Sequence, residues 1–444
     1  MATSGSFFYD TDSITGNVED VANYKPGGYH PVHLGDVLPK KSGTREPRYR
    51  VLQKLGHGSF ATVWLARDTH GDYGFVAVKI SVSCTTGTNN ETNILRWLRA
   101  NKQDHAGSGH VIRLLDDFAI QGPNGTHECL VTEVVMNISD VKNSSTLQAR
   151  TKDISFQTML GLSYLHEQGV AHGDLHSGNI AVSLPQLNDC LEQDIMDNAC
   201  PEYVPVIARN PMHQTDSLPA YLVSAFNMIY YFAEEDLPII TEDSCVKIMD
   251  FGNSFRREDE RPPPNTPSYI RAPEVTYCEL SKGEVGSDWN HSVDIWHAAC
   301  TLYELNFGTD MLGRMAGENY LIYNILQLSG LPPPAWQQYW DMEKFCKEQG
   351  VLSTIDLEAS WTERRARRNN YLAKVSPRSG LEQDTDQLID LLRMMLKIDP
   401  EERPKINGLL CHSWFAELDR GDPKSSPLPL ADLADPSADP VAKD

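Results

Sequence analysis

The sequence lacks the features that would place it in a membrane or a secretory route. Its nine cysteines include no Cys-x-x-Cys pair, and an odd number without such spacing favours reduced thiols over a disulfide framework. Its longest apolar stretch, residues 221–233, is interrupted by Ser224 and Asn227 and falls short of the roughly 20 apolar residues of a membrane span. The first residues carry neither the basic start nor the apolar run of a secretory signal. We therefore expect a cytoplasmic or nuclear protein, or both, without a membrane partner.

Positive charge is also scarce. The chain has 39 Lys and Arg against 61 Asp and Glu, a formal net charge of −22. An acidic field repels nucleic acid and favours cationic partners, although an acidic protein without such a partner has the same composition. With 444 residues, 40% hydrophobic and 23% charged, we expect a globular chain too long for a single core and therefore built from two lobes or domains.

The chain changes character near residue 140. Before this point, short runs rich in Val, Leu and aromatic residues alternate with glycine-containing turns, as in consecutive antiparallel strands, and residues 91–100 have the apolar spacing of a helix. After it, residues 153–169, 293–308 and 386–400 carry apolar residues at i, i+3 and i+4. The pattern predicts an α+β fold, with a small antiparallel β-sheet lobe that contains one key helix and a large, mostly α-helical lobe.

We place the folded domain at residues 49–416, with the small lobe at about 49–136 and the large lobe at about 137–416. Residues 1–48, which show no sustained periodicity, are expected to form an N-terminal extension. Residues 417–444, rich in Pro, Ala and Asp, are expected to form a disordered acidic tail. Trp64 and Trp97 are interpreted as core aromatics.

A glycine-containing turn joins the first two predicted strands at residues 55–63. Gly56 and Gly58 allow backbone N–H groups to approach phosphate oxygens without a Cβ in the way. The third glycine of the usual phosphate-binding pattern is Ala61. Because such turns are common in ordinary hairpins, this feature alone is a weak indication of a nucleotide site.

Lys79 ends an apolar strand, sixteen residues after Val63. An ammonium group buried without a partner is costly, so we expect it to be aimed at nucleotide phosphates and held by a counter-ion. Glu91, which opens the following predicted helix, is that expected counter-ion. Without Lys79, Glu91 would be interpreted as a first-turn glutamate that serves the helix dipole.

Oxygen-bearing side chains follow in two later segments. In His172-Gly-Asp-Leu-His-Ser-Gly-Asn179, Asp174 can accept or orient a hydroxyl proton and Asn179 can ligate Mg²⁺. Asp250, which opens Asp-Phe-Gly after a predicted strand, can bridge Mg²⁺ to phosphates. Further along, Glu274 and Arg403 are expected to form a buried ion pair within a helical lobe.

Taken in order, these motifs resemble those of eukaryotic-type protein kinases, over about residues 49–416. The resemblance implies the bilobal kinase fold and ATP and Mg²⁺ as cofactors, with Asp174, Lys79 and His176 catalytic and Asn179 and Asp250 as metal ligands. Thr132, Glu133 and Val135 would border the adenine pocket. The full set implied to bind the nucleotide is Leu55, Gly56, Gly58, Ser59, Val63, Ala77, Lys79, Glu91, Thr132, Glu133 and Val135.

Within that superfamily the chain resembles the SR-protein kinases, especially their short fungal members. The resemblance rests on residues 24–32, on Gly-Pro-Asn-Gly-Thr-His at 122–127 and on residues 59–68. It implies a monomeric serine/threonine kinase that acts on Arg/Ser-rich protein segments, as in the regulation of mRNA splicing. It also implies a spacer insert at about 184–218, within the 250 − 179 = 71 positions between Asn179 and Asp250, and a late insert at about 310–380.

Besides Ala61, two positions depart from the usual kinase pattern. Gly173 replaces the arginine that reads an activation-segment phosphate, and only 274 − 250 = 24 positions separate Asp250 from Glu274, so we expect activity without such phosphorylation. His176 replaces a lysine. An ordinary histidine has a pKa of about 6.5, and we hypothesise that turnover rises through His176 as the pH falls from about 8 toward that value.

Three alternatives stay open. A small-molecule kinase of the aminoglycoside or choline type has a similar catalytic loop but generally lacks the Glu274 motif and the framework of Asp294 and Arg403. A catalytically weak scaffold is the non-enzyme alternative, although such chains usually lose one of the catalytic residues that are retained here. Finally, the arginines of the late insert can bind an acidic partner or can form a solvated helix face; they are Arg364, Arg365, Arg367 and Arg368.

Overall fold

The computed structural model describes residues 7–8, 18–39, 46–86, 90–101, 104–141, 145–198, 201–208, 215–259, 266–314, 317–375, 380–416 and 418. The chain divides into two compact units. Unit 1 comprises Met1–Arg99, Ile112–Met136 and Val182–Ser244, and unit 2 comprises Ala100–Val111, Asn137–Ala181 and Cys245–Asp444. No helix in the described part of the chain is long and apolar enough to cross a membrane.

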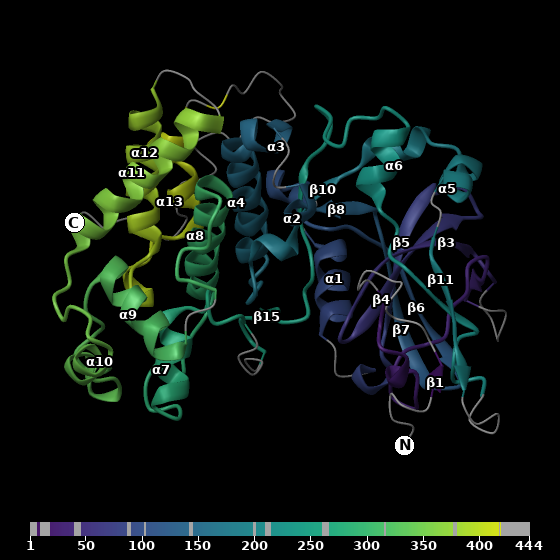
Figure 1. Ribbon diagram of the computed structural model, residues 1–444, viewed down its shortest axis with the longest axis horizontal. Helices are drawn as coiled ribbons and strands as arrows, with labels where there is room; N and C mark the ends of the chain where they lie inside the picture. The colour runs from purple at the N-terminus through teal and green to yellow at the C-terminus, as the bar shows by residue number, and fades with distance from the viewer. Residues whose placement is uncertain are drawn as a thin grey trace, which may run out of the picture. The chain divides into compact units, whose positions relative to one another are not determined.

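Unit 1 is built on a six-stranded antiparallel sheet (Figure 1). Its strand order is β2-β3-β4-β5-β7-β6, and buried Trp64, Val78 and Phe118 belong to its core. The following α1 has its buried residues at the i, i+3 and i+4 spacing that favours a helix. The elements are β2 (Val37–Leu38), β3 (Tyr49–Gly58), β4 (Ala61–Asp68), β5 (Phe75–Ser81), α1 (Glu91–Ala100), β6 (Leu114–Gly122), β7 (Gly125–Thr132) and β8 (Val135–Asn137).

The expected α+β architecture is confirmed, and five strands of this sheet, β3 to β7, lie within the predicted small lobe. The sixth strand, β2, lies in the N-terminal extension and was not predicted, because two residues are too few to show a period. Pro123 and Asn124 form the tight turn between β6 and β7, and Gly122 pairs with Gly125 across it. Trp64 is a core residue as expected, with 2% of its surface exposed, but the expectation for Trp97 was wrong. Trp97 lies outside the buried stripe of α1 and is 38% exposed.

Residues 182–244, which lie between the motifs of Asn179 and Asp250 and are here called the insert, also belong to unit 1. This differs from the expected lobe boundaries, which assigned the spacer to the large lobe from its position in the sequence. Its Val204, Val206, Leu218 and Leu222 share a second hydrophobic cluster with Val21, Tyr24 and Tyr29 of the extension. Its elements are α5 (Glu192–Asn198), β11 (Tyr203–Pro205), β12 (Ile207–Ala208), β13 (Tyr221–Val223) and α6 (Met228–Glu234), and β12 pairs with β1 (Phe7–Phe8) of the extension.

Unit 2 is mostly helical. In Figure 1, α4, α8, α11 and α12 lie side by side, and the contacts between these elements agree. Unit 2 also contains short strands, of which β9 pairs with β15. The elements are α2 (Ile138–Val141), α3 (Ser145–Ala149), α4 (Thr151–Glu167), β9 (Val170–Ala171), β10 (Ile180–Ser183), β14 (Val246–Ile248), β15 (Phe255–Arg256), α7 (Pro273–Leu280), α8 (Ser292–Phe307), α9 (Glu318–Ser329), α10 (Met342–Gln349), α11 (Leu357–Val375), α12 (Leu381–Met395) and α13 (Ile406–Leu410).

The four arginines of the late insert lie on α11 and are all engaged within unit 2. Arg368 is buried and donates to Asp384 and Thr385. Arg365 pairs with Asp386 and Arg367 with Glu363, while Arg364 donates to Ser360. These contacts argue against a site for an acidic partner, but the four arginines do not form a uniformly solvated helix face either, because Arg368 is buried. The acidic tail, apart from Leu418, lies outside the described residues.

A buried ion pair joins the start of α7 to the last helices of unit 2, as expected. The two terminal nitrogens of Arg403 each donate to a carboxylate oxygen of Glu274 at 2.7 Å, and the side chains are 0% and 1% exposed. The carbonyl groups of Lys397, Ser292 and Ile398 accept the other guanidinium hydrogen bonds. All five N–H groups of the arginine are thus used.

We expect Glu274→Gln to lower the free energy of unfolding by about 3–5 kcal/mol, because it leaves a buried guanidinium without its counter-charge. Urea denaturation followed by circular dichroism measures this. Glu358→Gln is the matched control, since Glu358 pairs with Arg393 on the surface with 76% of its side chain exposed, and we expect it to cost less than about 1 kcal/mol. Equal unfolding midpoints for the two variants would contradict the prediction.

Candidate functional site

Lys79 and Glu91 form the expected ion pair in unit 1. Lys79 Nζ donates to Glu91 Oε1 at 2.9 Å and to Oε2 at 2.8 Å. The lysine side chain is 26% exposed and the glutamate 5%, so the ammonium end is held by a buried carboxylate while part of the side chain stays accessible. This arrangement excludes the interpretation of Glu91 as a glutamate that serves only the helix dipole.

The sheet register aligns the other expected nucleotide residues of unit 1. Gly56 lies opposite Val63, and Val63 lies opposite Lys79 on the next strand. Ala77 lies opposite Thr132 at the end of β7. A Cβ added to Gly56 or Gly58 would meet no atom within 4 Å. The glycines therefore leave open space at the end of β3, two strands away from the strand that carries Lys79, and such space suits the close approach of a phosphate.

The segment after β7 is fixed by a side chain rather than by a strand pairing alone. Glu133 accepts a hydrogen bond from the backbone N–H of Arg113 at 2.9 Å, and Val135 opens β8. Glu133 therefore holds the backbone of this segment in place. Leu55 is half-buried and Ser59 exposed at the glycine turn; their nucleotide contacts stay predictions.

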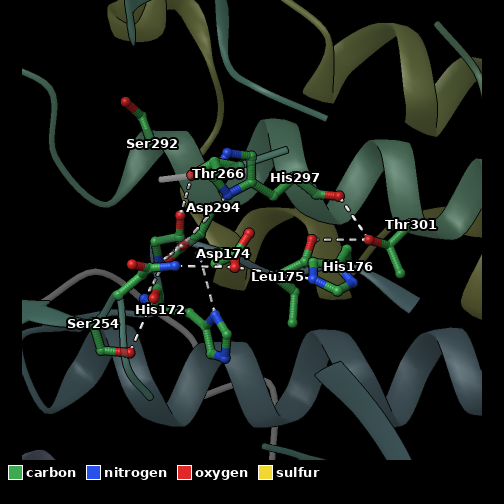
Figure 2. A network of polar contacts seen from close by, with 12 residues as sticks. His172, Asp174, Leu175, His176, Ser254, Thr266, Ser292, Asp294, His297 and Thr301 are labelled. Atoms are coloured by element: carbon green, nitrogen blue, oxygen red, sulfur yellow. Dashed lines mark hydrogen bonds and ion pairs between the residues drawn. The ribbon is translucent and has the colours of Figure 1, made fainter. Parts of the chain in front are cut away.

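In unit 2, the buried Asp294 of α8 organises the catalytic loop (Figure 2). Its Oδ2 accepts the backbone N–H of His172 at 2.8 Å and Nε2–H of His166 at 2.9 Å, and its Oδ1 accepts the N–H of Gly173 at 2.8 Å. Burial opposes ionisation, but the hydrogen bond from His166 and the neighbouring histidines outweigh it and hold the pKa of Asp294 well below its usual range. A carboxylate thus fixes two successive peptide groups directly before Asp174.

Asp174 is held so that one of its carboxylate oxygens is engaged and the other is not. Oδ2 accepts from Asn253 Nδ2 at 3.0 Å. Oδ1 is buried and has no hydrogen-bond partner among the residues that the structure describes. Burial raises the pKa of Asp174 to about 6, although His172 and the Asn253 hydrogen bond oppose the shift. The expected base is therefore a preorganised carboxylate with one acceptor oxygen left for a substrate hydroxyl.

The two expected metal ligands lie next to each other. The backbone N–H of Met249, which precedes Asp250, donates to the carbonyl of Asn179 at 2.9 Å. The Asn179 amide nitrogen donates to the carbonyl of Asp174 at 2.8 Å, which leaves its amide oxygen as the ligand atom. Asp250 has a left-handed backbone with φ 64°, a strained conformation for a residue with a side chain. The carboxylate and amide oxygens suit Mg²⁺.

Several residues of this network were not predicted as site residues. Asn253 holds Asp174, while Ser254 and Thr266 donate to the carbonyls of His172 and Gly173 at 2.9 and 2.8 Å. Thr301 of α8 donates to the carbonyl of Leu175 at 3.0 Å. Each is a single polar residue in an irregular segment or on a helix, and the only available signal was the proximity of Asn253 and Ser254 to Asp250.

The structure contradicts the expected titration of His176. Its Nδ1 accepts the backbone N–H of Gly178 at 3.0 Å, so it caps the short turn that carries Asn179. Burial, reinforced by His172, lowers the pKa of His176 to about 4. The residue is therefore uncharged between pH 8 and 6.5 and does not replace the permanent cation of a lysine. Its contribution is to position the loop.

We expect kcat/KM to fall as the pH drops through about 6, because only the ionised form of Asp174 can accept a proton. We expect no further step between pH 8 and 6.5. Steady-state rates at saturating nucleotide, measured from pH 8 to below pH 6, test both statements. His176→Asn, which keeps an acceptor for Gly178, serves as the control; a step above pH 6.5 that disappears in this variant would restore the titration of His176.

Gly173 occupies a position that no other residue fits. Its φ is +78°, and an added Cβ would lie 2.5 Å from the carbonyl oxygen of Asn253. The backbone at Gly173 therefore leaves no room for the arginine side chain that is usual at this position.

Gly173→Ala should reduce kcat by about 10- to 100-fold, because moving Asn253 also moves Asp174. Gly350→Ala is the matched control: its φ is +66° and nothing lies within 4 Å of the added Cβ, so strain should lower stability without changing kcat. Rates and thermal unfolding are measured for both. Wild-type turnover in Gly173→Ala would show that the close approach is unimportant.

Comparison with known proteins agrees with this geometry. The family described as "Protein kinase domain" matches residues 49–189 and 237–415, and the gap between these two matches, residues 190–236, falls within residues 182–244 of unit 1. A solved kinase domain, titled "Crystal structure of PF14_0431, kinase domain", has a similar fold, with a TM-score of 0.54 and 18% identity, over 86% of this chain and 98% of that one.

The relatives are serine/threonine kinases. A serine/threonine protein kinase of Aspergillus fumigatus is 27% identical over 89% of this chain and 90% of its own length. The serine/threonine-protein kinase SRPK of Physarum polycephalum is 26% identical over 94% of each chain. The serine/threonine-protein kinase SKY1 of Saccharomyces cerevisiae is 36% identical over 38% of this chain and 23% of its own. The chain therefore belongs to the protein kinase family, as a serine/threonine protein kinase that resembles the SR-protein kinases.

Proposed function

We propose that this kinase uses Mg²⁺ and ATP to phosphorylate serine in basic, Arg/Ser-type protein segments, and that it does so without phosphorylation of its activation segment. The observation that carries the substrate proposal is a guanidinium site beside the catalytic loop of unit 2. The site is made by Glu304, near the end of α8, and by Tyr269, which lies before α7.

The chain's own Arg314 occupies this site. Its Nη2 lies 3.3 Å from Glu304 Oε1, and its Cζ lies 4.4 Å from the centre of the Tyr269 ring. The other oxygen of Glu304 accepts from Ser177 Oγ at 2.8 Å, next to His176 in the catalytic loop. A carboxylate and an aromatic face together are the environment that binds a guanidinium group.

The site also lies within electrostatic reach of the catalytic base. Burial raises the pKa of Tyr269; Arg314 opposes this shift, whereas Glu304 and Asp174 add to it. The Arg314 side chain is 49% exposed, so a substrate arginine can exchange with it for the same partners. The net charge of −22 favours the approach of such a basic segment.

The residues present fit Mg-ATP. Lys79, held by Glu91, is an accessible cation, and the glycine turn offers backbone beside open space. Asn179 and Asp250 present the oxygen ligands that would hold the metal, which neutralises phosphate charge when bound. Asp174 Oδ1 would accept the proton of the substrate hydroxyl, while Asn253 fixes the orientation of the carboxylate.

Direct hydrogen bonds support activity without a phosphorylated activation segment. Thr266 donates to the carbonyl of Gly173 at 2.8 Å, and Arg271 donates twice to the carbonyl of Thr266, at 3.2 and 3.0 Å. The catalytic loop and this part of the segment are thereby joined through neutral backbone groups, and the arginine that would read a phosphate is replaced by Gly173. Retention of Lys79 and Asp174 argues against an inactive scaffold.

The test compares phosphate transfer to an Arg/Ser-repeat peptide, to a Lys/Ser-repeat peptide and to a neutral Ser/Thr protein. We expect wild-type transfer to the Arg/Ser peptide and none by Asp174→Ala. Glu304→Gln keeps an acceptor for Ser177 but loses the charge, and should lower kcat/KM for the Arg/Ser peptide by about 10- to 100-fold. Glu318→Gln, at the first residue of α9, is the control and should leave it unchanged.

Four results would contradict these proposals. Equal transfer to all three substrates would overturn the Arg/Ser preference, as would a wild-type rate in Glu304→Gln. ATP binding without transfer to any protein would favour a scaffold or a small-molecule substrate. Mass spectrometry of the active enzyme shows whether residues 250–274 carry phosphate, and activity that requires it there would overturn the constitutive proposal.

A further inference from the structure

The N-terminal extension contacts β3 at both ends of the glycine-rich turn. At one end, Lys54 is buried and paired with the buried carboxylate of Glu19. At the other, the hydroxyl of Tyr29 donates to the carbonyl of Gly58 at 2.8 Å. Between these two contacts lie Leu55 and Gly56, so the extension brackets the part of β3 that is expected to face nucleotide phosphates.

Tyr29 is itself held rigidly. It is 4% exposed, and its ring centre lies 5.4 Å from that of Tyr24. Its carbonyl accepts from Asn124 Nδ2 at 2.7 Å, and the carbonyl of Asn124 accepts the N–H of Gly27 at 2.8 Å. The hydroxyl that contacts Gly58 therefore belongs to a residue whose backbone is anchored to the β6–β7 turn.

The insert completes this arrangement. Its Val206 and Leu222 pack in the same cluster as Tyr24 and Tyr29. The N–H of Phe226 donates to the carbonyl of Lys54 at 2.7 Å. Asn124, which holds Tyr29, also donates to the carbonyl of Ser217 in the insert at 2.9 Å. The extension, the insert and the β6–β7 turn thus pack against one another, and the extension and the insert both contact β3 next to the glycine-rich turn.

We propose that Tyr29 is a positioning residue for nucleotide binding, and that the extension and the insert form a brace that holds the glycine-rich turn in its binding conformation. Glycines are conformationally permissive, and Gly56 and Gly58 have open space around them. The Tyr29 hydroxyl limits the conformations of this turn before nucleotide arrives. Ordering the turn in advance lowers the entropic cost of binding phosphates.

Tyr29→Phe removes only the hydroxyl that contacts Gly58. We expect the KM for ATP and the Kd for Mg-ATP to rise about 2- to 10-fold, the range of one hydrogen bond, with a smaller change in the KM for a protein substrate. Tyr164→Phe is the matched control. It also removes a buried tyrosine hydroxyl that donates to a backbone carbonyl, that of Asn101 at 3.1 Å, but it leaves the bond to Gly58 intact and should not change ATP affinity.

A second pair of variants tests the insert. Leu222→Ala opens a cavity in the shared cluster and should weaken ATP binding. Leu187→Ala, at a buried position outside that cluster, should lower stability without this effect. Thermal unfolding identifies variants that fail to fold, and ATP affinities are compared only among folded ones.

The inference rests on the proposed use of Mg-ATP. A wild type that binds no Mg-ATP in a direct titration would overturn that proposal. ATP affinity equal to wild type in Tyr29→Phe, or reduced equally in Tyr164→Phe, would overturn the positioning role of Tyr29. Equal ATP affinities of Leu222→Ala and Leu187→Ala would remove the insert from the brace.

Discussion

The active geometry of unit 2 depends on one buried carboxylate. Asp294 accepts hydrogen bonds from the backbone N–H groups of His172 and Gly173. It also accepts one from the side chain of His166, which lies on α4. Two adjacent peptide groups cannot point toward the same side chain in an ordinary extended strand. Gly173, with its positive φ, makes this possible. The position of Asp174 therefore follows from a charge placed on a rigid helix rather than from the loop alone.

From this anchor the remaining contacts are mostly to backbone. Ser254, Thr266 and Thr301 each donate to a carbonyl of the catalytic loop. The loop is thus fixed by its peptide groups, and the side chain of Asp174 keeps one oxygen for chemistry. The neutral, capping role of His176 fits this arrangement, because burial lowers its pKa even though Asp174 Oδ2 lies 3.9 Å from its Nε2.

Charged residues in apolar surroundings were the most predictable part of the molecule. Lys79 in an apolar strand and Arg403 in a helical lobe both required partners, and Glu91 and Glu274 provide them. The positions of α1, α4, α8 and α12 followed from apolar spacing. The role of Gly173 could be predicted only as a missing arginine, because neither its positive φ nor the nearby Asn253 carbonyl leaves a pattern in the sequence.

Contacts between distant, weakly patterned segments could not be predicted. Val204, Val206, Leu218 and Leu222 are scattered through a polar stretch, and only their packing against the extension shows to which unit they belong. The titration predicted for His176 was wrong for a similar reason, because the ordinary pKa of a histidine applies to a side chain exposed to water and His176 is partly buried. The sequence left the role of the arginines on α11 open, because it does not show that Arg365 pairs with Asp386 and Arg368 with Asp384.

The bond from Lys54 to the carbonyl of Val223 links residues 169 positions apart. During synthesis, the ribosome must therefore complete the first half of the chain, including the catalytic loop, before unit 1 can bury Lys54 fully. Contacts of such long sequence separation slow folding. Unit 1, although it begins first, closes its second core only after part of unit 2 has been made.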